Sequence, residues 1–349
     1  MNLRRVSGSS ESKSQLYLGD NAEILRYLLE ERDLRGKIDF VYIDPPFATN
    51  NTFTISKNKA NAISRSPDAK IAYSDTLTGD DYLEFLRERL VLLHDLMSDR
   101  GSLFVHIDYK IGHYVKVLLD EIFGMENFHN DIARIKCNPK NFRRKAFGNI
   151  KDMILFYSKT DDYIWNYVKV PLDQDDIDRL FRKTDENGRK YTTIPLHAPG
   201  ETKNGVTGEK WKGQYPPKGR HWRTSPKKLD ALDEKGLVEW SRNGVPRKII
   251  YADEHKGKKI QDIIKFKDPQ NPSYPTEKNL ELLELMVENS STPESIVLDC
   301  FCGSGTTLKA AESLDRCWIG IDSSEQAIEV CKKRIAGADF SFYSSSPST

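Results

Sequence analysis

A strand, a glycine turn and a helix follow one another over residues 297–307, and this order constrains the fold more than any other feature. The apolar pair Val297-Leu298 ends at Asp299, and Gly303 and Gly305 separate it from the helical residues that follow. Glycine lets the backbone approach a ligand closely, and the start of a helix offers unpaired N–H groups to an anion. We therefore expect a ligand site where the strands of a parallel sheet end.

The segments around this turn alternate between strand and helix signals. Apolar runs predict strands over 15–18, 38–43, 102–107, 153–157, 295–299 and 317–321. Apolar residues at helical spacing predict helices over 21–31, 80–96, 112–123, 276–289, 306–314 and 325–335. Strands that alternate with helices indicate an α/β fold with a doubly wound, mostly parallel sheet.

This rhythm is lost in the middle of the chain, so we divide the sequence into five segments. They are a disordered leader (1–14), two halves of the α/β domain (15–126 and 273–340), an inserted region (127–272) and a disordered tail (341–349). Residues 133–228 hold 22 Lys and Arg against 11 Asp and Glu, although the whole chain has a net charge of only +1. This excess indicates a module that binds a polyanion such as nucleic acid; a solvated, loop-rich surface is the alternative.

The composition excludes several other classes of protein. No stretch approaches the roughly 18 consecutive apolar residues of a membrane span, and the polar N-terminus lacks the apolar core of a signal peptide. The five cysteines have no metal-site spacing: Cys137, Cys300, Cys302, Cys317 and Cys331. We therefore expect no metal site, no membrane partner, and reduced thiols in a cytoplasmic protein.

A second carboxylate follows the next predicted strand, at Asp322, which lies 17 residues after Gly305. In this position a carboxylate can accept hydrogen bonds from ribose hydroxyls. The full G-x-G-x-x-G pattern of dinucleotide sites is absent, and the shorter turn suits a smaller anion such as the carboxylate of a methionine tail. A purely structural turn with a surface aspartate is the alternative.

The predicted strand over 38–43 ends at Asp44-Pro45-Pro46-Phe47. An amine on an aromatic base is a poor nucleophile, because its lone pair is delocalised into the ring. The Asp44 carboxylate and the Pro45 carbonyl can accept its two hydrogens, with the prolines fixing the direction of that carbonyl. Phe47 offers a flat face on which the base can stack. The alternative is a strand that two prolines simply stop.

Together, Asp-Pro-Pro-Phe and the later Phe-Cys-Gly-Ser-Gly-Thr-Thr resemble the motifs of the N6-adenine/N4-cytosine DNA methyltransferases, over residues 15–334. The catalytic motif comes first, which is similar to the circularly permuted β class. The resemblance implies the fold of S-adenosylmethionine-dependent methyltransferases, with S-adenosyl-L-methionine as cofactor and double-stranded DNA as substrate. It also implies base flipping and direct attack by the amine on the methyl group, without a covalent intermediate.

The resemblance further implies roles for single residues. It places Asp20 at the adenine of the cofactor, and Thr276 and Lys278 near its methionine end. The rest of the cofactor pocket would be formed by Asp299, Phe301, Gly303, Gly305, Thr306, Thr307 and Asp322. Three residues depart from the family pattern: Glu277 and Asn279 stand where Gln and Pro are common, and Phe47 replaces the commoner Tyr.

Two basic clusters with interleaved aromatic residues are the expected DNA contacts. They contain Lys140, Arg143 and Arg144, and then Lys212, Arg220, Trp222 and Arg223. Residues 48–75 are rich in Asn, Thr, Ser and Lys, and we interpret them as a mobile loop that closes over the flipped base. His106 with Asp108 indicates either acid–base chemistry or a structural placement.

In the family that the sequence resembles, Asp-Pro-Pro is typical of adenine enzymes and Ser-Pro-Pro of many cytosine-N4 enzymes. We therefore expect an adenine-specific DNA methyltransferase, with a cytosine-N4 enzyme as the alternative. A catalytically inactive, sequence-specific DNA-binding protein is the alternative of another class. The resemblance also suggests a restriction-modification system, with a cognate restriction endonuclease and a homodimer as further expectations.

Overall fold

The computed structural model describes residues 3–46, 52–56, 59–61, 70–74, 80–138, 145–272, 274 and 277–345. The chain forms two compact units, of which the first is Met1–Val168 with Gln261–Thr349 and the second is Lys169–Ile260. The second unit is shorter at both ends than the inserted region expected over 127–272. The difference arises because residues on both sides of it add strands to the sheet of the first unit.

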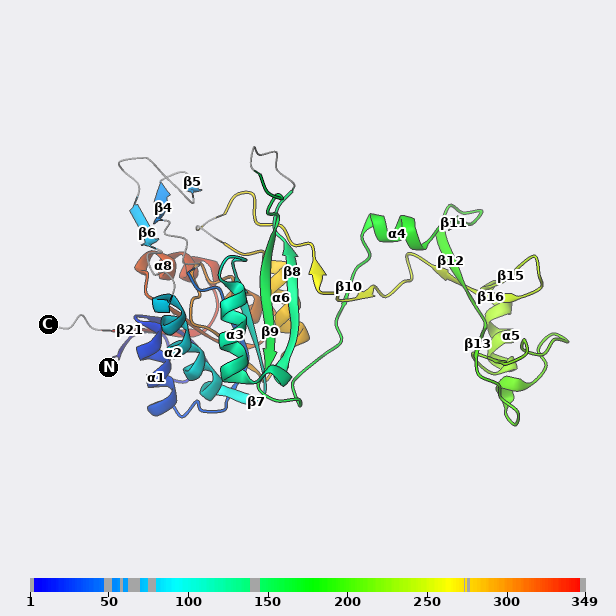
Figure 1. Cartoon of the computed structure of the whole chain (residues 1–349), viewed down its shortest axis with the longest axis horizontal. Coiled ribbons are helices and arrows are strands. Elements are labelled where there is room, and N and C mark those ends of the chain that lie inside the picture. The colour runs from blue at the N-terminus through cyan, green and yellow to red at the C-terminus, as the bar shows by residue number, and fades with distance from the viewer. Residues whose placement is uncertain are drawn as a thin grey trace. The chain divides into compact units, whose positions relative to one another are not determined.

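The first unit is built on one ten-stranded sheet (Figure 1). In spatial order its strands are β1 (Leu3–Ser7), β21 (Phe340–Ser345), β2 (Ser14–Leu18), β20 (Cys317–Asp322), β19 (Ile296–Asp299), β3 (Ile38–Ile43), β7 (Met97–Ile107), β9 (Lys151–Ser158), β8 (Phe128–Ile135) and β18 (Ile263–Ile264). Neighbours from β21 to β7 are parallel, whereas β1 and β9 run antiparallel to their neighbours. The predicted mostly parallel α/β sheet is confirmed.

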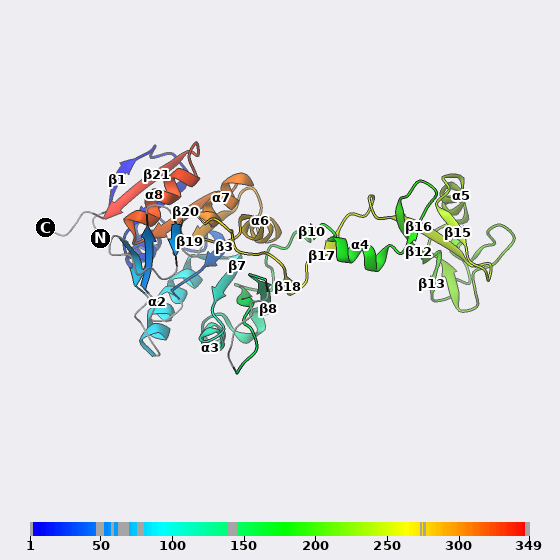
Figure 2. The ribbon, with the colours of Figure 1, turned by 90° about the horizontal axis from the view of Figure 1, so that it is seen from above.

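Helices cover both faces of this sheet (Figure 2). One face carries α1 (Asn21–Glu30), α2 (Asp80–Leu96) and α3 (Gly112–Phe123), and the other carries α6 (Leu280–Asn289), α7 (Thr306–Ser313) and α8 (Glu325–Arg334). The short 3-10 helix η1 (Met125–Asn127) follows α3. Helix α6 begins four residues later than predicted, because the side chain of Asn279 caps it by accepting a hydrogen bond from the Leu282 N–H.

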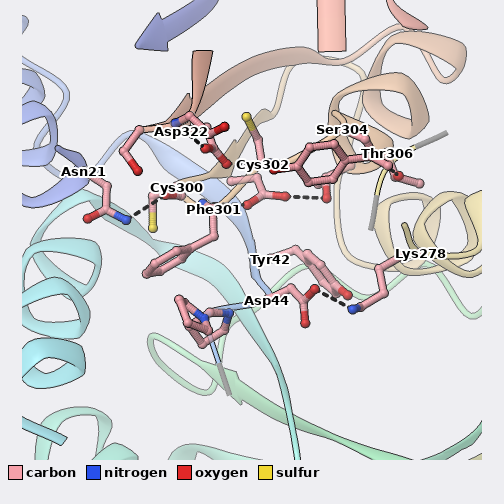
Figure 3. A pocket seen from close by; sticks show the side chains of 18 of the residues that line it. Asn21, Tyr42, Asp44, Lys278, Cys300, Phe301, Cys302, Ser304, Thr306 and Asp322 are labelled. Carbon is pink, nitrogen blue, oxygen red and sulfur yellow. Dashed lines mark hydrogen bonds and ion pairs between the residues drawn. The ribbon is translucent and has the colours of Figure 1, made fainter. Parts of the chain in front are cut away.

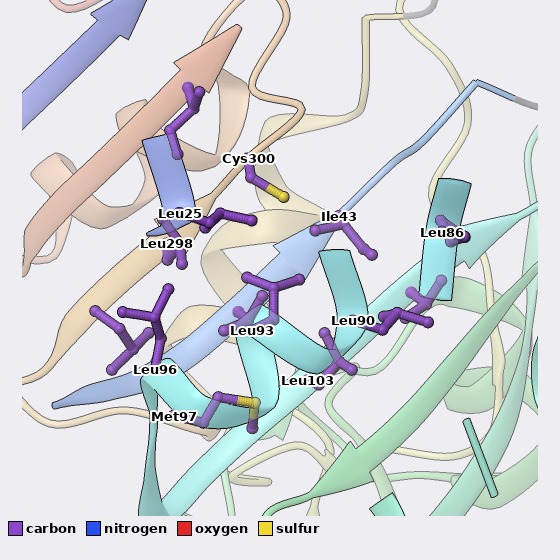
Figure 4. Packing of buried hydrophobic residues seen from close by; sticks show 14 of the residues in the cluster. Leu25, Ile43, Leu86, Leu90, Leu93, Leu96, Met97, Leu103, Leu298 and Cys300 are labelled. Atoms are coloured by element: carbon purple, nitrogen blue, oxygen red, sulfur yellow. The ribbon is translucent and has the colours of Figure 1, made fainter. Parts of the chain in front are cut away.

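The main core lies between the sheet and the first three helices (Figure 4). Leu86, Leu90 and Leu93 of α2 lie on one side of that helix and are fully buried. They belong to the same cluster as Ile43 of β3 and Leu103 of β7, whose alternate positions face these helices. The cluster fixes the ends of β3 and β7, which matter for the site below.

Both chain ends add strands to the sheet, so the predictions of a disordered leader and a disordered tail are wrong for residues 3–7 and 341–345. Strand β21 pairs with β2, and β1 pairs with β21. Tyr343 stacks on Tyr17 with 4.9 Å between ring centroids. The tail contributes the aromatic side chains that cover the edge of the sheet, and this outweighs its Ser-rich composition.

The second unit has secondary structure that the sequence analysis did not predict. A four-stranded sheet joins β11 (Lys183–Thr184), β12 (Lys190–Pro195), β16 (Pro246–Tyr251) and β15 (Val238–Trp240). The other elements are α4 (Gln174–Leu180), α5 (Pro226–Glu234), η2 (Val206–Gly208) and the strand pairs β10 (Lys169–Val170) with β17 (Lys258–Lys259) and β13 (His197–Pro199) with β14 (Arg220–Trp222). Leu196, Trp211, Trp222 and Leu229 form its small core.

Residues 48–75, which we interpreted as a loop, contain strands in the structure. Strand β4 (Thr52–Ser56) pairs antiparallel with β5 (Lys59–Asn61) and β6 (Lys70–Ser74). The sequence Thr-Phe-Thr-Ile is typical of a strand, and the polar composition of the whole segment obscured it. Across the described part of the chain, no helix has the length and apolar character needed to cross a membrane.

Candidate active site

The candidate site lies where four neighbouring parallel strands end. Leu18 of β2 pairs with Asp322 of β20, and Asp299 of β19 pairs with Gly320 of β20. Strand β3, beside β19, ends one residue before Asp44. Because parallel strands have their carboxyl ends at the same edge, residues far apart in the sequence meet there.

A cavity of about 430 Å³ opens at this edge (Figure 3). Its lining includes most of the described residues that the sequence analysis selected: Asp20, Asp44, Pro45, Pro46, Lys278, Asp299, Phe301, Gly303, Thr306, Thr307 and Asp322. Phe47 and Thr276 lie outside the described residues, as do Lys140, Arg143 and Arg144. The catalytic and cofactor motifs, which are separated by some 250 residues in the chain, therefore share one cavity.

Gly305 shapes the turn instead of lining the cavity. Its φ is +77°, a left-handed conformation that L side chains rarely adopt, and it caps the start of α7. A Cβ built on it would lie 2.5 Å from the sulfur of Cys331 on α8. Both observations require glycine here and allow α7 to point its N-terminus at the cavity.

Asp322 holds the same turn from the next strand. Its carboxylate accepts hydrogen bonds from the backbone N–H groups of Gly303 and Ser324, both at 2.8 Å. Burial raises the pKa of Asp322, although these backbone hydrogen bonds lower it in part. Asp322 thus stabilises the turn and also lines the cavity. Each of its oxygens accepts one backbone hydrogen bond and keeps a further lone pair for a ligand hydroxyl.

Asp299 is buried and lies at the end of β19. It accepts hydrogen bonds from the Phe301 N–H at 3.0 Å and from the Thr307 hydroxyl at 2.6 Å. Burial nevertheless raises the pKa of Asp299 to about 7, with contributions from the nearby charges of Asp44 and Asp322. This carboxyl group therefore changes its charge near neutral pH.

One end of the cavity contains three residues that the sequence analysis missed. Arg89 of α2 is almost fully buried and donates hydrogen bonds to Asn21 at 2.6 Å and Asp20 at 3.2 Å. Its guanidinium lies 3.6 Å from the centroid of the Phe85 ring. Asn21 in turn donates to the carbonyl of Cys300, at 2.9 Å. Phe85, Arg89 and Asn21 therefore connect the middle of α2 and the start of α1 to the glycine turn. The four-residue spacing of Phe85 and Arg89 was the available signal.

The other end of the cavity holds Asp44 and Lys278. The Lys278 ammonium contacts Oδ2 of Asp44 at 2.5 Å, and both side chains are mostly buried. The second carboxylate oxygen, Oδ1, is buried and accepts no hydrogen bond from the described part of the chain. A buried acceptor without a donor is costly, so Oδ1 is suited to a donor that arrives with a ligand.

Glu277, where the sequence departs from the family pattern, is paired in the structure. It contacts Arg334 at the end of α8, at 2.5 Å. Arg334 also donates a hydrogen bond of 2.6 Å to the Thr306 hydroxyl at the start of α7. The guanidinium therefore neutralises the additional carboxylate at the mouth of the cavity. Sequence reasoning could not pair residues from two distant elements.

The predicted DNA-binding residues of the second unit fall into two groups. Lys212, Arg220 and Arg223 are exposed. Trp222 is only 1% exposed and packs against Trp211 in the core of the unit, so the prediction that its ring contacts DNA is wrong. Its alternating strand position buries it, whereas Tyr215 and Trp240 keep exposed rings.

The chain is similar to known proteins over nearly its whole length. Residues 38–333 match the N6/N4 family model described as DNA methylase. The chain is 40% identical to the type II methyltransferase M.EcaI of Enterobacter cloacae over 344 residues, which are 95% of this chain and 73% of that relative. It is 28% identical to the type II methyltransferase M.KpnI of Klebsiella pneumoniae, over 90% of this chain and 80% of that relative. Its fold is similar to that of the PvuII DNA methyltransferase (cytosine-N4-specific), with a TM-score of 0.51 and 11% identity over 97% of this chain and 98% of that one.

The raised pKa of Asp299 predicts a dependence of stability on pH. The group is protonated in the folded state up to a pKa of about 7 but ionised above its ordinary value of 3.8 in the unfolded state. Between these values the folded state binds one more proton, so the free energy of unfolding falls by roughly 1.4 kcal/mol for each pH unit of increase. Asp299→Asn should remove this slope.

The measurement is urea unfolding of the cofactor-free wild type and variant at several pH values from 4.5 to about 7.5, a window set by the two pKa values. The advantage of the wild type over Asp299→Asn should shrink as the pH rises. The exposed carboxylate Asp131 gives the control Asp131→Asn, which should keep the wild-type slope. Parallel curves for the wild type and Asp299→Asn would contradict the assignment.

Proposed function

The chain belongs to the N6/N4 family of DNA methylases, and from this premise we propose that it methylates adenine N6 in double-stranded DNA, with S-adenosylmethionine as methyl donor. The observation that carries the proposal is that Asp44 lines the cavity and that its buried Oδ1 accepts no hydrogen bond from the described residues. An amine that arrives in the cavity supplies the donor that this oxygen lacks.

The chemistry of the cavity fits S-adenosylmethionine. Asp20 and Asp322 offer acceptors for its adenine amine and ribose hydroxyls, and the rings of Phe85 and Phe301 lie nearby, 6.2 Å apart. Burial, and after it the charges of Asp44 and Asp322, raise the pKa of Asp299. These carboxylates gathered around one cavity favour a ligand that carries positive charge. When bound, the cofactor supplies a methyl group activated on a cationic sulfur.

Asp44, Pro45 and Lys278 would act on the amine that receives the methyl group. Lys278 holds Oδ2 of Asp44, so the carboxylate presents Oδ1 in one fixed orientation. Oδ1 and the Pro45 carbonyl accept the two hydrogens of the amine, which localises its lone pair for attack. Lys278 thus orients the Asp44 carboxylate, in addition to its expected place near the methionine end of the cofactor. Asp44 also lies within reach of the proton that the methylated amine must release.

We prefer adenine over cytosine because Asp-Pro-Pro is typical of the adenine enzymes in the family that the sequence resembles. The N4-specific alternative is favoured by one observation, the similar fold of a methyltransferase described as cytosine-N4-specific. An inactive DNA-binding protein is disfavoured, because it would have no use for a desolvated carboxylate oxygen that lacks a donor. The order of the motifs along the chain supports placement in the circularly permuted β class.

We assign DNA recognition to the second unit, together with the basic residues of 139–144. Residues 169–260 contain 21 Lys and Arg against 14 Asp and Glu. Exposed Arg220 and Arg223 are suited to phosphates or guanine edges, and exposed Tyr215 and Trp240 add aromatic surface. A homodimer, a cognate restriction endonuclease and a cytoplasmic location complete the proposal.

The proposal is tested by the product of the reaction. The purified protein is incubated with methyl-labelled S-adenosylmethionine and bacterial genomic DNA, which is then digested to nucleosides and analysed by mass spectrometry. We expect the label in N6-methyladenine. Label only in N4-methylcytosine would establish the alternative base, and tight DNA binding with no label on any DNA would establish the inactive protein.

Asp44 and Asp322 should separate chemistry from cofactor binding. We expect Asp44→Ala to lower the methyl-transfer rate by roughly 10³-fold or more, because it removes an acceptor used in the transition state, while calorimetric affinity for S-adenosylmethionine changes little. Asp322→Ala should instead weaken that affinity roughly tenfold or more through the lost hydroxyl acceptor. Equal loss of affinity in both variants would contradict the two roles.

A further inference from the structure

A row of buried polar side chains crosses the sheet beneath the cavity, and the reaction proposed above makes no use of it. Tyr42 lies on β3, His106 on β7, Asp152 on β9 and Arg134 on β8. These four strands are neighbours in the sheet, and all four residues are at most 5% exposed. Burying polar groups costs free energy that their hydrogen bonds only offset, so a buried polar row of this kind suggests a function.

The row is linked by hydrogen bonds from the cavity to the far strand. The Tyr42 hydroxyl lies 2.7 Å from Nδ1 of His106, and Nε2 of His106 lies 3.1 Å from Oδ2 of Asp152. Asp152 also accepts from the Lys136 ammonium at 2.5 Å and from Arg134 at 3.3 Å. His106 therefore links Tyr42 to Asp152 within the buried row. The structure shows no hydrogen bond between His106 and Asp108 that would support the acid–base interpretation.

The charges at the far end determine where each hydrogen lies. Burial would raise the pKa of Asp152, but the hydrogen bond from His106 and the ammonium of Lys136 lower it below its usual range. Burial and then the charge of Lys278 lower the pKa of His106 below its ordinary value of 6.5, against the raising effects of Asp152 and Asp44, so the neutral ring is the favoured form above that pH. A neutral ring has one N–H, and the Asp152 carboxylate requires a donor at Nε2. Nδ1 is then an acceptor, and the Tyr42 hydroxyl donates to it.

We propose that Asp152 and His106 are positioning residues for methyl transfer, which hold the hydroxyl hydrogen of Tyr42 away from the cavity. Tyr42 lines the cavity beside Asp44 and Lys278 (Figure 3) and so presents only acceptor lone pairs there. The lone pairs of the Tyr42 oxygen stabilise positive charge in this region, both on the Lys278 ammonium and on a cationic methyl donor. The proposal rests on methyl transfer but not on the choice of adenine over cytosine.

The substitution Asp152→Asn reverses the hydrogen bonds between residue 152, His106 and Tyr42, and it leaves the size of the side chain almost unchanged. The Lys136 ammonium contacts Oδ1 of Asp152, so an asparagine at 152 keeps its carbonyl oxygen there and places its NH₂ at the position of Oδ2, toward His106. Arg134, whose contact with Oδ2 is the longer one at 3.3 Å, keeps Asp268 and the Phe266 carbonyl as acceptors. Nε2 of His106 then becomes the acceptor, and its hydrogen moves to Nδ1. Nδ1–H donates to the oxygen of Tyr42, whose own hydrogen turns toward the cavity. An aspartate-to-asparagine change beside a histidine forces the wrong tautomer in this way in serine proteases.

The test compares Asp152→Asn with a matched charge-loss control in two backgrounds. Asp268 bonds the same Arg134 at 2.6 Å but does not touch His106, so Asp268→Asn removes a neighbouring charge without reversing the row. We expect Asp152→Asn to lower kcat for DNA methylation roughly tenfold or more, and Asp268→Asn by less than about twofold. In a Tyr42→Phe background, which has no hydroxyl to turn, Asp152→Asn should change kcat by less than about twofold.

The tautomer of His106 gives a second measurement that does not require activity. Long-range ¹H–¹⁵N correlation spectra of the labelled protein, assigned with His106→Gln, should show a protonated Nε2 in the wild type and a protonated Nδ1 in Asp152→Asn. A protonated Nδ1 in the wild type would overturn the proposal, and this result does not depend on how well any variant folds. An equal loss of kcat from Asp152→Asn with and without the Tyr42 hydroxyl would overturn it as well.

Discussion

The meeting of four parallel strand ends at one sheet edge is the constraint on which the rest of the structure depends. Strand β3 delivers Asp44, β19 delivers Asp299, and β20 delivers Asp322, while α1 begins just after β2 at Asp20. Asp20 and Asp44 lie near the start of the sequence, whereas Asp299 and Asp322 lie near its end. Parallel pairing with closely packed helices brings them around a single cavity, so the site exists only when the sheet is complete.

Bringing acidic groups together in a poorly solvated place has an electrostatic cost, and the structure offsets it locally. Lys278 contacts Asp44, Arg334 contacts Glu277, and Arg89 contacts Asp20. Asp299 contacts no such cation in the described residues, and burial raises its pKa to about 7. The remaining imbalance favours a positively charged ligand, which agrees with the cationic methyl donor that we propose.

The sequence was sufficient for the parts of the structure that depend on local patterns. Periodicity identified the strand before Asp44 and the helix over 80–96, and turn chemistry required Gly305. It was insufficient where partners come from distant elements. The Glu277–Arg334 pair, the contact of Arg89 with Asn21 and the burial of Trp222 all depend on tertiary packing that no local signal encodes. Strand β21 was missed because its Ser-rich composition outweighed its aromatic residues, and β1 was missed because the N-terminal residues are polar.

The central claim is that Oδ1 of Asp44 receives the amine of a base that has left the duplex. The most direct measurement is a crystal structure of the protein with S-adenosylhomocysteine and a duplex that contains its methylation site, which sequencing of methylated DNA would supply. The account predicts the target adenine N6 at about 3 Å from Oδ1 of Asp44, with Lys278 on Oδ2. A flipped base whose amine is held by other groups, with Oδ1 facing no substrate atom, would contradict it.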